Sequence, residues 1–376
     1  SPGVPPERLE VYRERKIPVL GELEIGCREI RAPIVAVTGT NGKSTVVTNI
    51  AKGLADAGKR AVAIGNLGTP ITEWVDREEA ADCVVLEVSS YQLETIVEFR
   101  PHVGVVLNIA PDHLSHHGTM EAYVTAKSRI SMNQSIDDVL LLHRDLSEHQ
   151  ALQKTRGRLY WYGQGLPPSR DGLSLAGGVL RWHGGEADWS REIKTETLLT
   201  HEIDNLLACV ATLHLLGVSA DSAVRLFRDW IRLPHRIERV AEVGGVTYIN
   251  DSKATNAHAA IAALRAIPGG LVWLVGGEGK GEDLSDLVVA ARGASISSVI
   301  CFGRDREVFR AAFSEDLKVE VRDTLREAFD LAAAVARPGE TVLLSPACAS
   351  FDEFNSFEDR GDQFRGWVAA LQEARS

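Results

Sequence analysis

Three observations predict an α/β protein with a doubly wound parallel sheet, followed by a second, smaller α/β domain. Short, nearly continuous apolar runs alternate with helical patterns along most of the chain, as in sheets that helices cover on both faces. The segment 233–236, which reads LPHR, interrupts this alternation once. At 376 residues, with 44% hydrophobic and 25% charged residues, the chain is long enough for two or three soluble domains.

In the first domain, expected at 34–232, a buried strand at 34–37 leads through a glycine-containing turn into a helix that begins near Ser44 and runs past Leu54. Further parallel strands are predicted at 61–64, 83–88, 103–107 and 139–142. A small antiparallel patch is then expected at 155–200, with helices at 204–216 and 220–230.

The second domain, expected at 233–376, carries apolar runs that predict strands at 246–250, 270–275, 299–302 and 341–344. Residues 1–33 hold too few apolar residues to bury a core, and they predict one short charged helix at 7–16. Ligands of such α/β sheets bind beyond the carboxyl ends of the strands, so the loops there are the candidate site.

The bulk properties exclude several classes of function. The net charge of −11 argues against nucleic acid as the main partner, because that interaction needs a basic stripe. The five scattered cysteines form no C-x-x-C pair, which indicates reduced thiols in the cytoplasm. No apolar run is long enough to cross a membrane, so no membrane insertion is expected.

The strongest motif is TGTNGKST at 38–45, a strand, a tight turn and a helix start in that order. The turn directs backbone N–H groups into one concavity, Lys43 can reach outer phosphates, and Ser44 or Thr45 can offer a hydroxyl to magnesium. Val37 stands where the usual spacing has a glycine. The motif predicts a phosphate-binding loop, and hence a P-loop NTPase-like first domain.

Other polar residues follow the predicted strands of the first domain. Glu87 could hold magnesium at a strand end, or it could cap the next helix together with Ser89 or Ser90. His113 follows another strand, and the sequence leaves open whether it serves the site or the packing. Lys127 reads as an ordinary surface lysine, and the neighbours His116 and His117 read as a solvated loop.

Three loops of the second domain share its ligand edge. Residues 250–256 place small polar side chains around one acid and one lysine, which suits a polar ligand, although a plain helix cap explains them too. The glycine-rich loop 276–280 and the segments 345–352 and 357–361 follow two further strands. Convergence of these loops predicts a second polar pocket.

These motifs resemble those of the Mur ligases, in particular their D-glutamate-adding branch, whose carboxyl-terminal domain is Rossmann-like. The resemblance rests on TGTNGKST at 38–45, EVSSYQL at 87–93, LPHR at 233–236, NDSKATN at 250–256 and LSPACAS at 344–350. It implies an ADP-forming ligase that joins D-glutamate to UDP-N-acetylmuramoyl-L-alanine through an acyl phosphate, in the cytoplasm, as a monomer.

The resemblance also implies the roles of individual residues. The residues implied to take part in catalysis are Lys43, Glu87, His113, Lys127, His235 and Arg236. ATP would be bound by Gly39, Thr40, Asn41, Gly42, Lys43, Ser44, Thr45, Asn205, Arg236, Asp251 and Lys253. Two magnesium ions would be held by Ser44, Thr45, Glu87, His113 and Lys127, the last as a carbamate formed with CO2. The two acceptor substrates would be bound by Ser1, Pro2, Gly3, Asn66, Ser89, Thr255, Lys280, Ser350, Phe351 and Phe357.

The sequence departs from the family pattern at two places. Glu202 replaces a family asparagine beside the adenine-side helix. Residues 1–33 match only the last part of the family's UDP-binding domain and its linker, so a chain that truly starts at Ser1 is expected to have weak or no ligase activity. Two alternatives stay open: another ligase of the Mur or folylpolyglutamate type, and an ATP-binding protein without ligase activity.

Overall fold

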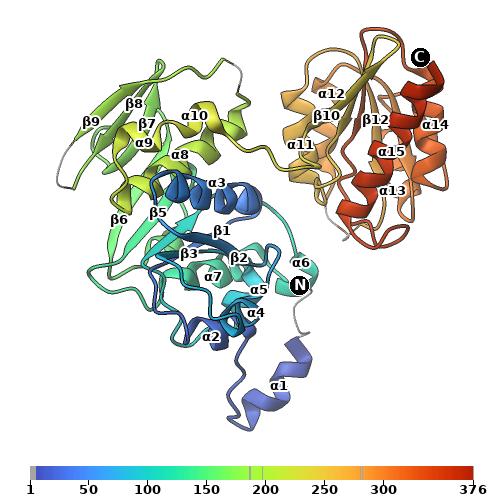
Figure 1. Ribbon diagram of the computed structural model, residues 1–376. Helices are drawn as coiled ribbons and strands as arrows, with labels where there is room; N and C mark the ends of the chain where they lie inside the picture. Colours follow the sequence, from blue (N-terminus) through green and yellow to red (C-terminus); the bar gives the residue numbers. More distant parts are fainter. Residues whose placement is uncertain (1–5, 186–187, 197, 280, 282, 376) are drawn as a thin grey trace. The chain divides into compact units, whose positions relative to one another are not determined.

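The computed structural model describes residues 6–185, 188–196, 198–279, 281 and 283–375. The chain forms two compact units, Ser1–Ile231 (unit 1) and Arg232–Ser376 (unit 2). Each unit has a largely parallel sheet with helices on both of its faces (Figure 1). The predicted α/β fold class is confirmed.

The sheet of unit 1 has nine strands in the order β2-β3-β1-β4-β5-β6-β7-β8-β9. The strands from β2 to β7 are parallel, and β8 and β9 are antiparallel to their neighbours. The antiparallel patch expected at 155–200 is present in β7, β8 and β9, which extend the main sheet. The strands are β1 (Ile34–Thr38), β2 (Ala61–Gly65), β3 (Cys83–Glu87), β4 (Val103–Val106), β5 (Val139–His143), β6 (Arg158–Gln164), β7 (Gly172–Ala176), β8 (Val179–His183) and β9 (Trp189–Glu192).

Helices cover both faces of this sheet. The predicted single helix at 220–230 is wrong, since α9 and α10 are two short helices. The helices of unit 1 are α1 (Pro6–Glu14), α2 (Glu22–Cys27), α3 (Lys43–Asp56), α4 (Ile71–Asp76), α5 (Ser90–Leu93), α6 (Leu114–His117), α7 (Met120–Ser128), α8 (Thr200–Leu215), α9 (Ala220–Ala223) and α10 (Leu226–Asp229), with 3-10 turns η1 (Arg129–Ser131), η2 (Arg144–Leu146) and η3 (Gln150–Gln153).

Alternate residues of the central strands pack into two separate hydrophobic cores, one on each face of the sheet. On one face, Val35 and Val85 pack with the apolar sides of α3 and α8, and on the other, Ala36 and Leu86 pack with α4 and α5. This alternation follows from the two-residue period of a strand. It explains why the strands read as continuous apolar runs in the sequence.

Unit 2 repeats this arrangement with six strands in the order β10-β11-β15-β12-β13-β14, and only β10 is antiparallel to its neighbour. The sequence analysis missed β10 and β14. A Gly-Gly pair at 244–245, with φ of 60° and 79°, forms the tight turn from β10 to β11 and is a hairpin signal. The elements are β10 (Glu238–Val243), β11 (Val246–Asn250), β12 (Leu271–Gly276), β13 (Ile296–Phe302), β14 (Val319–Val321), β15 (Thr341–Leu344), α11 (Ala257–Ala266), α12 (Ser285–Gly293), α13 (Arg306–Phe313), α14 (Leu325–Val335) and α15 (Phe357–Arg375).

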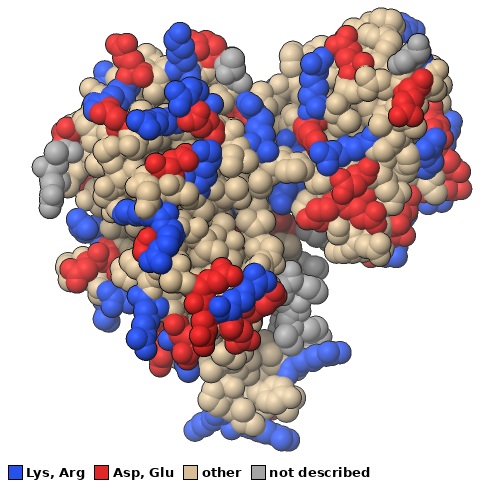
Figure 2. All heavy atoms as spheres, viewed as in Figure 1, with Lys and Arg blue, Asp and Glu red and all other residues tan. Residues whose placement is uncertain are grey.

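On the face of each unit seen in Figure 2, lysines and arginines are interspersed with acidic residues, without one broad basic stripe among the residues drawn in colour. Among the described residues, no helix combines the length and the apolar character that a bilayer crossing requires.

The amino-terminal segment is fixed to unit 1 through α2. Leu23 is buried in the core, and the buried Glu24 carboxylate accepts hydrogen bonds from the backbone N–H groups of Val97, Glu98 and Phe99 at 2.8–3.1 Å. Burial alone would raise the pKa of this carboxyl. Its hydrogen bonds outweigh burial, so the pKa of Glu24 lies below its ordinary value.

We expect Glu24→Ala to lower the free energy of unfolding by about 2–5 kcal/mol, because three backbone donors lose their acceptor. The folded-state pKa is depressed, so this stabilisation is present at neutral pH and is lost as the pH falls below the ordinary carboxyl range. Denaturant unfolding at pH 7 and pH 3 measures both effects. The exposed neighbour provides the control, since Glu98→Ala should cost less than about 1 kcal/mol. Equal costs for the two variants would contradict the assignment.

Candidate active site

The TGTNGKST turn lies where the strand order of unit 1 reverses. Strand β1 is flanked by β3 and β4, so the turn at its carboxyl end meets the ends of both neighbours. Gly42 has a φ of 89°, and a Cβ built on it would come within 2.5 Å of the Asn205 Oδ1 atom. Only glycine therefore fits this position, and Asn205 of α8 lies directly beside the loop.

Asn108, two residues after β4, holds the loop through hydrogen bonds that could not be predicted from the motif alone. Its Oδ1 accepts from the Asn41 N–H at 2.8 Å, and its Nδ2 donates to the Asn41 carbonyl at 3.0 Å. Its own carbonyl accepts from the Thr40 N–H at 3.0 Å. An asparagine immediately after a buried parallel strand was the available signal, because that position faces the ligand edge.

Lys43 is the first residue of α3, and its side chain folds back over the loop. Its Nζ donates to the carbonyls of Gly39 and Thr40 at 2.8 Å and 2.7 Å. The first N–H groups of a helix have no partner within the helix, and they carry a partial positive charge. Ser44 and Thr45 are buried in the same first turn. The loop, the lysine and the helix start thus form one cationic and donor-rich surface.

Two buried oxygens beside the loop lack a hydrogen-bond partner among the described residues: Thr45 Oγ1 and Glu87 Oε2. Glu87 ends β3, is only 4% exposed, and accepts from Asn66 Nδ2 at 3.0 Å through its other oxygen. The cap of α5 is Ser89, so Glu87 is not needed there. A hydroxyl and a carboxylate oxygen left unsatisfied in this way fit the oxygen ligands that Mg2+ prefers.

Lys127 of α7 is almost fully buried. The prediction that it is a surface lysine is therefore wrong. Its Nζ donates to the Gly39 carbonyl at 2.9 Å and lies 4.6 Å from the centre of the Tyr123 ring. Burial, with a contribution from the nearby Lys43 charge, lowers the pKa of Lys127 well below its ordinary value, and Asp112 and Glu87 oppose this only in part. Burial therefore weakens the preference of this side chain for the charged form.

His113 reaches the same region from the segment after β4. Its backbone is left-handed, with φ of 55°, which is uncommon for a residue other than glycine and concentrates at functional sites. Its ring lies 4.9 Å from that of Tyr91 and 6.4 Å from that of Tyr123, between centroids. The Tyr123 hydroxyl is in turn 3.1 Å from Thr40 Oγ1 of the phosphate loop.

The following His116 and His117 are not solvated, contrary to expectation: their side chains are 11% and 1% exposed and contact Glu94.

At the start of α8, Glu202 accepts a hydrogen bond from the Leu199 N–H at 3.0 Å. The residue that departs from the family pattern therefore caps the start of α8.

In unit 2, the buried Asp251 follows β11 and accepts from Ser345 Oγ at 2.7 Å and from the Ile237 N–H at 3.1 Å. Burial raises the pKa of Asp251 to about 7 despite these bonds. His235, with a left-handed backbone, places its Nδ1 2.9 Å from Asn250 Nδ2. Burial lowers the pKa of His235.

The loops of unit 2 meet around Arg360, whose side chain is completely buried. Its guanidinium donates to the Ser252 carbonyl and hydroxyl and to the carbonyls of Cys348 and Ala349, at 2.8–3.2 Å. Glu278 and Ala349 also exchange two backbone hydrogen bonds at 3.1 Å. The loops after β11, β12 and β15 are thus brought together, as the sequence predicted.

The proposed amino-acid-site residues occupy different environments within this arrangement. Ser350 is buried, whereas Phe351 is 69% exposed, and Thr255 is half-buried. Lys253 Nζ lies 4.5 Å from the ring centre of Phe357. Arg236 is half-buried next to His235. Four predicted residues lie outside the described part of the chain: Ser1, Pro2, Gly3 and Lys280.

Comparison with known proteins identifies the family of the chain. The family model of the Mur ligase middle domain matches residues 37–213, and that of the Mur ligase glutamate ligase domain matches residues 235–348. The chain belongs to the Mur ligase family, as its motifs predicted. Among curated relatives, the UDP-N-acetylmuramoylalanine–D-glutamate ligase of Pelotomaculum thermopropionicum is 41% identical, over 99% of this chain and 83% of that protein. The ligase of the same name from Acidobacterium capsulatum is 37% identical, over 98% and 81%.

Solved structures with the same fold include the MurF ligase from Thermotoga maritima in complex with ADP, with a TM-score of 0.69 and 17% identity over 94% of this chain and 83% of that one. The FolC protein of E. coli in complex with DHPP and ADP has a TM-score of 0.68 and 18% identity, over 100% of both chains. At these identities the likeness shows a shared fold.

We expect Asn108→Ala to raise the KM for ATP by about 5- to 50-fold, because the 38–42 turn loses two side-chain hydrogen bonds that hold its shape. Steady-state kinetics with varied ATP measures the change. Asn133→Ala is the matched control, since Asn133 also donates to two backbone carbonyls but in the loop before β4. An unchanged KM for ATP in Asn108→Ala, with the fold intact, would refute the role.

Proposed function

We propose that this chain catalyses the ATP-dependent addition of D-glutamate to UDP-N-acetylmuramoyl-L-alanine, a step of peptidoglycan precursor synthesis. One observation carries the proposal: the phosphate loop, the buried Lys127 and the unsatisfied Glu87 oxygen lie together at the switch point of unit 1. The name shared by the curated relatives supports the choice of substrates. The free cysteines among the described residues support a reducing compartment such as the cytoplasm.

In the proposed reaction, the terminal alanine carboxylate of the acceptor attacks the γ-phosphorus of ATP, and ADP leaves as an acyl phosphate forms. The D-glutamate amine then attacks the activated carbonyl, loses a proton, and expels phosphate. Lys43 and the first turn of α3 would hold the phosphates and offset the charge that develops on them, the main contribution that a protein makes to phosphoryl transfer. Asn205 would bind the nucleotide beside Gly42.

Magnesium would be held by Ser44 or Thr45, Glu87, His113 and a carbamate on Lys127, and it would neutralise phosphate charge. The two buried oxygens without a partner fit such an ion. Lys127 suits carbamate formation because burial lowers the pKa of its amine: the lone pair of the deprotonated nitrogen would attack CO2, and the carbamic acid would release a proton. The product is an anionic oxygen ligand in place of an ammonium.

Unit 2 would bind the incoming amino acid through Lys253, Thr255, Lys280, Ser350, Phe351 and Phe357, and it would contact the nucleotide through Arg236 and Asp251. The support is the meeting of three loops on Arg360, which gives a fixed polar edge. We further propose that Asn66 and Ser89 contact the acceptor substrate near Glu87. A role for Ser1–Gly3 near the UDP diphosphate stays a prediction.

The direct test is phosphate release by the full-length protein with ATP, UDP-N-acetylmuramoyl-L-alanine and one amino acid at a time. We expect turnover with D-glutamate and at least 100-fold less with L-glutamate, and none in Lys43→Ala, which lacks the phosphate-binding ammonium. A folate acceptor with L-glutamate tests the folylpolyglutamate-type alternative, and turnover there in place of D-glutamate would overturn the proposal. ATP binding without phosphate release under any combination would instead indicate a non-enzymatic ATP-binding protein.

We expect the ligase activity to depend on CO2 through Lys127. Activity should fall in CO2-depleted buffer and return on addition of bicarbonate, whereas Lys127→Ala should lose about 100-fold or more in both conditions. Lys52→Ala, which removes a half-buried lysine paired with Asp56 on α3, is the control and should respond to bicarbonate like the unaltered protein. Bicarbonate-independent activity would remove the carbamate from the proposal while leaving the ligase assignment intact.

A further inference from the structure

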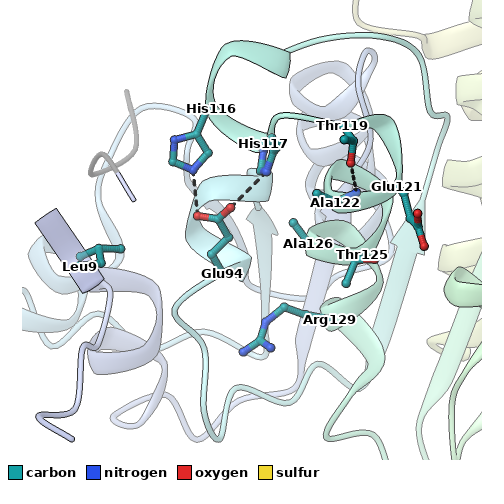
Figure 3. Close-up of a pocket in the computed structure, with 10 residues that line it drawn as sticks. All are labelled: Leu9, Glu94, His116, His117, Thr119, Glu121, Ala122, Thr125, Ala126 and Arg129. Carbon is teal, nitrogen blue, oxygen red and sulfur yellow. Dashed lines mark hydrogen bonds and ion pairs between the residues drawn. The ribbon is translucent and has the colours of Figure 1, made fainter. Parts of the chain in front are cut away.

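A second cluster of ligand-type side chains lies near the proposed reaction centre but takes no part in it. Glu94 is the residue at the carboxyl end of α5, and His116 and His117 form the end of α6. Figure 3 shows both imidazole rings directed at the Glu94 carboxylate from the facing helix, with Arg129 further away. Both histidine side chains are largely buried, and that of Glu94 is 26% exposed.

The three side chains lie close enough together to share one metal ion. His116 Nε2 lies 2.9 Å from one carboxylate oxygen, and His117 Nδ1 lies 3.1 Å from the other. One ligand atom from each of the three residues falls within 4.8 Å of the others. A tetrahedral zinc site with bonds of about 2.0–2.1 Å separates its ligand atoms by about 3.3 Å, so small rotations of these side chains would suffice.

Ser90 contacts the other ring nitrogen of His117. Its hydroxyl lies 3.0 Å from His117 Nε2. In the tautomer in which Nε2–H donates to this hydroxyl, the lone pair on Nδ1 faces Glu94 and is available to a metal ion. A metal-binding histidine commonly donates its other N–H to a polar group in this way, which fixes the tautomer and the ring orientation.

The cluster is accessible from one side. A pocket of about 600 Å3 opens beside it and is lined by all three residues, by Leu9 of α1 and by several residues of α7. Solvent in this pocket can provide the fourth ligand that two imidazoles and one carboxylate leave open.

We propose that Glu94, His116 and His117 form a binding site for a divalent transition metal of the zinc class, with a water molecule from the pocket as fourth ligand. Two imidazole nitrogens and one carboxylate oxygen suit Zn2+ far better than Mg2+, which prefers oxygen ligands alone. The site is thus chemically distinct from the oxygen-rich centre around Glu87 and Thr45.

Occupancy of this site would join α5 to α6. The segment before α6 carries His113 in its left-handed conformation, and the rings of His113, His116 and His117 all contact Tyr91. A metal bridge would therefore stabilise this turn. The inference does not rest on the proposed ligase activity, because its test measures metal binding alone.

The test is titration of the chelator-treated, full-length protein with Zn2+, followed by calorimetry. We expect one equivalent to bind at least 100-fold more tightly than Mg2+ and to raise the Tm. His116→Ala and Glu94→Gln should each weaken this binding at least 10-fold, and Ser90→Ala, which keeps all three ligands, by about 10-fold. Co2+ in place of Zn2+ should give the visible absorption bands of a four-coordinate site.

Two controls locate the ion. His113→Ala, at the proposed magnesium centre, and His183→Ala, which removes an exposed histidine paired with Asp188, should both leave Zn2+ binding unchanged. Circular dichroism without metal checks that each variant folds. The proposal is overturned if no Zn2+ binds, if binding survives in Glu94→Gln and His116→Ala, or if it is lost in His113→Ala. Any of these results would leave the cluster as a hydrogen-bonded group of two histidines on one carboxylate.

Discussion

The candidate site of unit 1 is built around the backbone carbonyl of Gly39, which accepts hydrogen bonds from two lysines. Lys43 and Lys127 both donate to the Gly39 carbonyl, at 2.8 Å and 2.9 Å. Burial, with a smaller contribution from the nearby Lys43 charge, lowers the pKa of Lys127 well below its ordinary value. The Gly39 turn thus holds two lysines in different environments, Lys43 partly buried at the start of α3 and Lys127 almost fully buried on α7.

The parallel sheet makes this arrangement possible. The loop after β1, the carboxylate that ends β3 and the asparagine that follows β4 meet because these strands are neighbours with the same direction. Residues about 20 to 70 positions apart in the chain thereby share one edge. In unit 2, loops that follow parallel strands also meet at one edge of the sheet. There the buried Arg360, rather than a pair of lysines, donates hydrogen bonds to the loops after β11 and β15.

The family membership and the curated relatives indicate the class of reaction. The structure shows which side chains lie close enough together to form one site. The unpartnered oxygens of Thr45 and Glu87, for example, cannot be recognised from any motif. The grouping of Glu94, His116 and His117 is likewise visible only in the structure.

The α/β class, most strands, the phosphate loop and the family could be predicted from the sequence, because these depend on local periodicity and on residues adjacent in the chain. The hydrogen bonds of Asn108 and the burial of Lys127, His116 and His117 are visible only in the three-dimensional structure. The physical reason is that burial and charge proximity depend on which elements pack together: an isolated lysine on a helix reads as exposed until a turn 88 residues away accepts its hydrogen bond.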